Sequence, residues 1–151
     1  MPNAKILRFV QLGRRQQCIL VEALAALGAS SAAARFLPFR WSVRMGSRKL
    51  SRKVQGGCDC IRDVHWGIEV AAAGAPWRAV CLQKGLALQW MLRRRGIDAL
   101  LHYGLAKEKA GKLEAHVWVS VGDKLVIGGE IASKFHCVAS FPQANAATTA
   151  F

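Results

Sequence analysis

Acidic residues are scarce in this chain of 151 residues, which has nine Asp and Glu against 22 Lys and Arg. The shortage is most severe in residues 1–53, where Glu22 is the single acid among 11 basic residues. Residues 54–151 are nearly balanced, with 11 basic and eight acidic residues. A basic segment joined to a balanced one predicts an acidic partner, such as nucleic acid, anionic lipid or an acidic peptide.

Secretory and membrane signals are also missing. Charged residues interrupt the first 15 positions, which contain no small-residue cleavage site. The longest apolar stretch, residues 18–38, includes Glu22 and Arg35 and is too polar for a membrane span. A helix that lies in the membrane interface is the alternative interpretation. The five cysteines are an odd number. With no signal peptide, they predict a reduced cytoplasmic protein with free thiols.

Motifs for cofactors and metals are absent as well. The run Gly128-Gly129-Glu130 lacks the Lys and Ser/Thr of a phosphate-binding loop. Cys58-Asp59-Cys60 resembles half of a metal site, but no second Cys/His pair follows at zinc-finger spacing. We therefore expect a function that needs no metal and no cofactor.

The apolar content, 52% of the chain, is enough for one buried core, and the 21% of charged residues is too low for a disordered polyelectrolyte. Helical periodicity predicts helices over residues 4–28, 30–37, 61–73 and 78–95. Alternation predicts strands over residues 99–106, 113–121 and 125–127, with a hairpin turn at Gly122-Asp123. Helices followed by a group of strands indicate an α+β fold.

Cys81 stands near the start of the strongest predicted helix, shortly after Pro76. Amides and the dipole at a helix N-terminus stabilise a thiolate, and the same amides can bind an oxyanion. A thiolate nucleophile needs a base that takes its proton and returns it to the leaving group. We predict that His116 is this base, on the polar face of strand 113–121, because a cysteine on a helix start followed by a histidine on a strand is the papain-type arrangement. His102 on the preceding strand is the weaker candidate.

A third group is expected to orient the imidazole of His116. If the hairpin turns at Gly122-Asp123, His116 lies opposite approximately residue 129, which makes Glu130 an immediate or diagonal neighbour. Asp123 lies in the turn, roughly 20 Å along the strand. Glu130 is therefore the better prediction. A backbone carbonyl is the alternative, because a Cys–His pair can work as a dyad.

Three motifs occur in order along the chain, at residues 76–82 (PWRAVCL), 90–97 (WMLRRRGI) and 114–119 (EAHVWV). Together they resemble the transglutaminase-like B proteins of lasso peptide biosynthesis, in the stand-alone form called B2. Residues 127–130 and 135–142 are similar to the C-terminal end of that family. The resemblance covers about residues 60–142, and the N-terminal helices match the family only in character.

The resemblance implies a papain- or transglutaminase-like cysteine protease fold and an enzyme that removes the leader from a lasso precursor peptide. It implies two partners: a leader-recognition B1 protein, and an ATP-using lasso cyclase that closes the freed amino group onto an acidic side chain. The family triad is Cys-His-Asp, and Cys81 and His116 match its first two members. The third departs from it, because this chain has Glu130 near the expected strand position and Asp123 in the turn. The implied organisation is one compact domain, with a basic helical N-terminal segment (residues 1–57), a catalytic core (58–142) and a flexible tail (143–151).

Two other functions fit parts of the sequence. The basic segment, which carries Phe39 and Trp41 among its arginines, fits a module that binds nucleic acid or a membrane. A run of charge is usually a solvated face, so we expect no nucleic-acid partner and only weak contact with a membrane or another anionic surface. Acyl transfer to an amine by a transglutaminase-like enzyme would use the same nucleophile, and only its products distinguish it from proteolysis.

Overall fold

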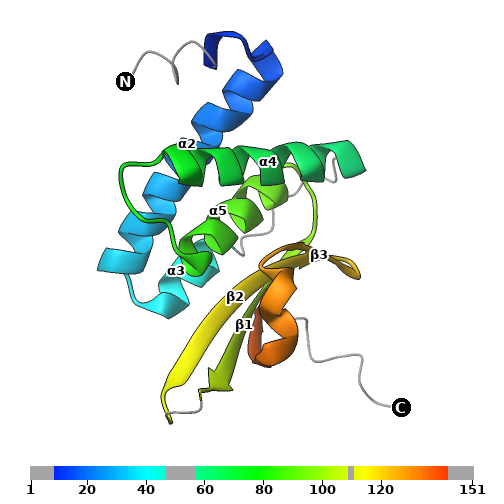
Figure 1. Cartoon of the computed structure of the whole chain (residues 1–151). Coiled ribbons are helices and arrows are strands. Elements are labelled where there is room, and N and C mark those ends of the chain that lie inside the picture. Colours follow the sequence, from blue (N-terminus) through cyan, green and yellow to red (C-terminus); the bar gives the residue numbers. More distant parts are fainter. Residues whose placement is uncertain (1–8, 47–56, 109–110, 143–151) are drawn as a thin grey trace.

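The computed structural model describes residues 9–46, 57–108 and 111–142 (Figure 1). The elements in chain order are α2 (Arg14–Phe36), α3 (Phe39–Gly46), α4 (Cys58–Gly74), α5 (Cys81–Arg94), β1 (Ala99–Lys107), β2 (Leu113–Val121), β3 (Lys124–Ile127), the 3-10 helix η1 (Gly129–Lys134) and β4 (His136–Phe141). Helices followed by strands confirm the α+β class predicted from the sequence.

The four strands form one antiparallel sheet in the order β3-β2-β1-β4. β1 and β2 pair along their whole length, from Ala99 opposite Val121 to Lys107 opposite Leu113. The short strand β3 pairs only with residues 119–121 of β2, and its register shifts within that pairing. Among the residues that the structure describes, none forms a strand paired with β2 beside His116 on the β3 side.

The helices α2, α4 and α5 cross one another on one side of the sheet (Figure 1). The core lies between them and the sheet, and its fully buried side chains include Leu88 and Leu92 of α5 and Leu101 and Val119 of the sheet. Gly85 allows α5 to approach β2 closely, since a Cβ atom there would lie 2.8 Å from Val117 Cγ1. This contact brings the start of α5 against β2.

Helix α2 runs without a break through Gly28, where the sequence predicted a helix end. The expectation of two helices was wrong because a single glycine costs a helix only about 1 kcal/mol and alanine-rich turns surround this one. Trp77 is the nearest neighbour to a Cβ built at Gly28, at 4.0 Å. By length and hydropathy α2 could cross a membrane, yet 33% of its apolar window is buried inside the protein.

Glu22, the single acid of the basic segment, holds α2 to the C-terminal end of α5. Its Oε1 accepts a hydrogen bond from Arg95 Nη1 at 3.0 Å, and Arg94 Nη1 lies 3.3 Å from the same oxygen. The hydrogen bond with Glu22 raises the pKa of the Arg95 guanidinium above its ordinary value, against the opposing effect of burial. This ion-pair cluster joins α2 to the C-terminal end of α5.

Several element bounds differ from the prediction. The helix predicted over 61–73 begins earlier, at Cys58, and the helix predicted over 78–95 begins later, at Cys81. The elements η1 and β4 were not predicted. The predicted helix residues 4–8, the basic residues 47–53 and the predicted flexible tail 143–151 lie outside the described residues.

Candidate active site

Cys81 is the first residue of α5, one turn before the close contact at Gly85. The backbone N–H of Val80 donates to Gln83 Oε1 at 2.8 Å, which is half of a capping box. Ser30 of α2 donates its hydroxyl to the carbonyl of Gln83 at 3.0 Å. Two contacts therefore fix the helix start, whose first amides have no carbonyl partner within the helix and are available to an oxyanion.

His116 lies on β2 with only 8% of its surface exposed. Its Nε2 is 2.8 Å from the carbonyl oxygen of Gly128. A carbonyl can only accept, so this hydrogen bond assigns the proton of the neutral ring to Nε2. Nδ1 then carries the lone pair and is the nitrogen able to take a proton. It makes no hydrogen bond to any residue that the structure describes.

Gly128 is required at this position for two reasons. Its φ of +72° lies in the left-handed region, which residues with a Cβ rarely adopt. A Cβ atom there would also lie 2.6 Å from the carbonyl oxygen of Val117 and 3.2 Å from His116 Nε2. The glycine lets the chain turn away after β3 and brings its carbonyl oxygen within hydrogen-bond distance of the imidazole.

The ring plane of His116 is held by aromatic neighbours. Trp118 stacks on one side with ring centroids 6.1 Å apart, and the ring of Phe135 lies 5.0 Å from the imidazole. Gly104 of β1 makes room for this stack, because a Cβ there would lie 2.6 Å from Trp118 Cζ3. The predicted polar face of β2 is therefore a buried aromatic face around His116, covered in part by the residue that follows η1.

His102, the weaker sequence candidate, stacks on Trp118 at 5.7 Å. Its Nδ1 lies 2.7 Å from Ser140 Oγ and its Nε2 lies 2.7 Å from Ser120 Oγ, so both ring nitrogens are engaged. Burial lowers the pKa of His102 below its ordinary value because it penalises the imidazolium form. A neutral ring with both nitrogens bonded is a structural residue rather than a base.

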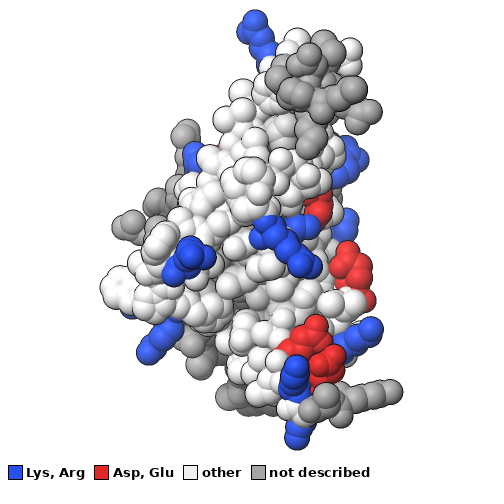
Figure 2. Space-filling model, turned by 60° about the vertical axis from the view of Figure 1, so that its left-hand side comes forward, with Lys and Arg blue, Asp and Glu red and all other residues white. Residues whose placement is uncertain are grey.

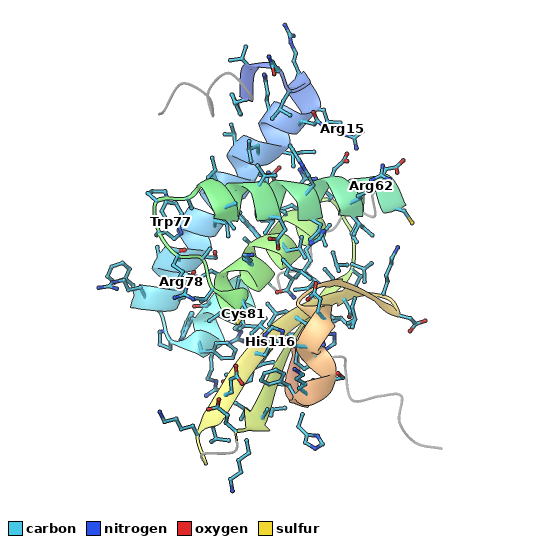
Figure 3. The ribbon with its side chains drawn as sticks, viewed as in Figure 1. Arg15, Arg62, Trp77, Arg78, Cys81 and His116 are labelled. Atoms are coloured by element: carbon cyan, nitrogen blue, oxygen red, sulfur yellow. The ribbon has the colours of Figure 1, made fainter. Side chains whose placement is uncertain are left out.

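One cleft of about 320 Å³ contains both Cys81 and His116, where the start of α5 meets β2 (Figure 3). Within the described residues no hydrogen bond joins the thiol to the imidazole, as is common in structures without substrate. The other lining residues come from α4, from the loop before α5, from α5 itself, and from the β2–η1 region: Glu69, Ala79, Lys84, Val117, Ile127, Gly128 and Glu130.

The cleft also contains an ion pair that the sequence analysis missed. Lys84 Nζ lies 2.9 Å from Glu69 Oε2. Lys84 follows Cys81 by three residues on α5, so helical spacing alone could have placed it near the thiol. Glu69 belongs to α4, and its approach depends on how the two helices cross, which no local pattern encodes. The pair places one ammonium group and one carboxylate in the wall of the cleft.

The structure does not place Glu130 across a ladder from His116, as the sequence predicted. β3 ends at Ile127, and Glu130 lies in the first turn of η1. It lines the cleft, but the imidazole nitrogen that it was expected to orient bonds the Gly128 carbonyl instead. Asp123 lies in the β2–β3 turn and is not among the cleft residues. A catalytic role for Glu130 stays a prediction.

Cysteines elsewhere show no metal site in the described part of the chain. Residues 9–46, 57–108 and 111–142 contain no group of three or more His, Cys, Asp or Glu side chains that could hold a metal ion. Cys58 and Cys60 lie in the first turn of α4, where Asp59 pairs with Arg62 at 3.1 Å. All five cysteines are free thiols.

A family model described as the transglutaminase-like superfamily matches residues 23–140, which run from α2 into β4. The chain belongs to the transglutaminase-like superfamily. This superfamily includes cysteine proteases and acyltransferases, and its fold agrees with the helices and antiparallel sheet described above. No curated protein and no solved structure gives a significant match.

Proposed function

We propose that this transglutaminase-like enzyme is a cysteine peptidase that removes the leader peptide from a lasso precursor peptide. The observation that carries the proposal is the shared cleft of Cys81 and His116, with the imidazole held by the Gly128 carbonyl. The lasso-specific part rests on the three sequence motifs, two of which contain these residues.

The first half of the reaction forms an acyl-enzyme. Nδ1 of His116 takes the proton of the Cys81 thiol, and the thiolate attacks the carbonyl carbon of the bond between leader and core. The amides of the first turn of α5 stabilise the oxyanion that develops. The C–N bond then breaks, and the imidazolium gives its proton to the departing amine of the core peptide.

The second half releases the leader. His116 takes a proton from water, the hydroxide attacks the thioester, and the thiolate leaves the tetrahedral intermediate and is protonated again. Throughout, the Nε2–H of His116 donates to the Gly128 carbonyl and so keeps Nδ1 as the reacting nitrogen. The cycle balances with one water consumed and needs neither metal nor cofactor.

The proposed partners follow from this role. The leader-recognition B1 protein presents the leader, and the lasso cyclase receives the core peptide with its free amino group. The proposed compartment is the cytoplasm, where thiols remain reduced.

The test is to incubate the protein with a lasso precursor peptide and its leader-recognition protein, and to weigh the products by mass spectrometry. We expect a leader and a core whose masses sum to that of the precursor plus one water. Cys81→Ala should give no product, whereas the exposed Cys137→Ala should process normally. An amide-linked product would support an acyltransferase instead, and an intact precursor would contradict leader removal.

A further inference from the structure

A second concave site lies on the opposite side of α5 from the cleft. It is an apolar groove of about 110 Å³ between α2, α3 and α5, and it shares no lining residue with the cleft. Small side chains form most of its wall, so that backbone and methyl groups lie at its floor. The principal residues are Ala26, Ala29 and Ala33 of α2 and Leu86, Ala87 and Trp90 of α5.

Large apolar side chains stand exposed at the corner where α2 ends and α3 begins. Phe36 is 78% exposed, Leu37 is 40% exposed and Trp41 is 61% exposed. Leu37 caps the C-terminal end of α2 with an extended backbone, and its N–H donates to the carbonyl of Ala33, a lining residue of the groove, at 2.9 Å. Exposed aromatic groups beside an apolar hollow are a common feature of protein interaction sites.

Unpaired positive charge surrounds this corner. Arg35, Arg40 and Arg44 are exposed and form no ion pair with the residues that the structure describes. No acidic residue occurs between positions 23 and 46 to screen them. At the other end of the groove, Arg94 lies over the Trp90 ring at 5.4 Å. Figure 2 shows basic atoms spread over this side of the molecule, whereas the acidic atoms gather toward one edge.

We propose that this α2–α3 surface, made of the groove, Phe36, Leu37, Trp41, Arg40 and Arg44, docks an acidic amphipathic polypeptide segment. One apolar side chain of the segment fills the groove, and its carboxylates pair with the arginines of α3. The biological partner, a leader or its recognition protein, rests on the proposed function; the docking chemistry does not.

The shape of the site favours a polypeptide over the other acidic partners. A membrane surface would cover the protruding Phe36 and Trp41 but would leave a hollow lined by alanine methyl groups unfilled. A nucleic acid would stack bases on exposed aromatic rings and contact phosphates, and it has no aliphatic side chain for the groove. An amphipathic segment matches both the hollow and the charge.

The test uses the full chain carrying Cys81→Ala, so that no probe is cleaved, and measures binding by fluorescence anisotropy. The probe is a labelled synthetic peptide of Glu and Ala with Leu at every third or fourth position. A second peptide has Ser in place of each Leu. Vesicles of phosphatidylglycerol and phosphatidylcholine and a labelled single-stranded DNA are compared at the same salt concentration.

We expect the Leu peptide to bind about tenfold more tightly than the Ser peptide, because only the Leu peptide fills the groove. Ala33→Leu fills the groove without changing the charge. This variant should lower the affinity for the Leu peptide to that for the Ser peptide. Each of the single variants Arg40→Glu and Arg44→Glu should weaken the binding of both peptides, and Arg14→Glu is their matched control, since it makes the same charge change and Arg14 is exposed at the far end of α2. Circular dichroism checks that each variant is folded.

Three results would overturn the proposal: equal binding of the two peptides, an equal loss with Arg14→Glu, or binding of vesicles or DNA without binding of the Leu peptide. The first would leave a purely electrostatic surface, and the last would assign the surface to another class of partner. Because the Cys81→Ala background performs no chemistry, a failure here is distinct from a failure of leader removal by the unmodified enzyme.

Discussion

Two histidines flank Trp118 on the same face of the sheet, and their surroundings differ in kind. His102 lies inside the sheet, opposite Trp118 on β2 and opposite Ser140 on β4, and hydroxyl groups occupy both of its nitrogens. His116 lies where β3 has already ended, and only its Nε2 is bonded. Both residues are histidines on antiparallel strands of the same sheet.

The difference between the two histidines lies in what surrounds each ring. At His102, each of the two neighbouring strands supplies a serine hydroxyl to one ring nitrogen. The early end of β3 and the left-handed turn at Gly128 place a carbonyl on Nε2 of His116, and Nδ1 makes no hydrogen bond to the described residues. We predict that these surroundings, and not the residue type alone, make His116 rather than His102 the base.

The largest expected effect separates the two histidines directly. His116→Gln should slow leader removal by about 10²- to 10⁴-fold, the usual worth of general acid–base catalysis. His102→Gln should slow it by about threefold or less, because glutamine can still bond the two serines. Single-turnover rates by mass spectrometry measure both. A larger loss at His102 than at His116 would reverse the assignment of the base.

A second expected effect tests the carbonyl that holds His116. Gly128→Ala should destabilise the protein by about 3 kcal/mol, from strain at positive φ and from the clash with the Val117 carbonyl. Gly111→Ala is the matched control: its φ is +78° and a Cβ there meets nothing within 4 Å, so only strain of about 1 kcal/mol is expected. Urea unfolding midpoints measure both. Equal losses would mean that the space around Gly128 is unimportant.

A smaller effect is expected at the acidic residues. Glu130→Gln should slow processing by about tenfold, equivalent to about 1.4 kcal/mol, since Glu130 lines the cleft but the Gly128 carbonyl already holds the ring. Asp123→Asn, in the β2–β3 turn, should leave the rate unchanged. Rates with identical leader and recognition protein provide the measurement. A loss at Asp123 without one at Glu130 would contradict the geometry of the cleft.

The smallest effect concerns stability at mildly acid pH. The pKa of His102 is lowered in the folded protein, so the unfolded chain binds its proton first as the pH falls below 6.5. The folded state should therefore lose stability in that range, and His102→Gln should flatten this part of the profile. Thermal unfolding at a series of pH values checks it. An unchanged slope in the variant would show that His102 is not the titrating group.

The sequence predicted the parts of the site that depend on local pattern. Cys81 at a helix start follows from Pro76 and the apolar periodicity, and the β2–β3 hairpin follows from Gly122-Asp123. The backbone carbonyl that was the alternative to Glu130 is the group that bonds His116. Predictions for Cys81 and His116 as catalytic residues await the experiments above.

What the sequence could not predict depends on contacts between distant segments. The register shift within β3 and the turn at Gly128 move Glu130 off the ladder, and counting residues from the turn cannot detect either. β4 was missed because His136 and Cys137 obscure the alternation of a short edge strand. Glu69 approaches Lys84 only because α4 crosses α5.

The most direct test of the central claim is the rate at which iodoacetamide alkylates each of the five cysteines, followed by peptide mass spectrometry. Exposure alone would make Cys18, Cys58 and Cys137 react fastest, because they are exposed and Cys81 is partly buried. If His116 activates the thiol, Cys81 reacts fastest in the unmodified protein, loses that advantage in His116→Gln and keeps it in His102→Gln. Alkylation in the order of exposure, with no change at Cys81 in His116→Gln, would contradict a Cys81–His116 catalytic pair.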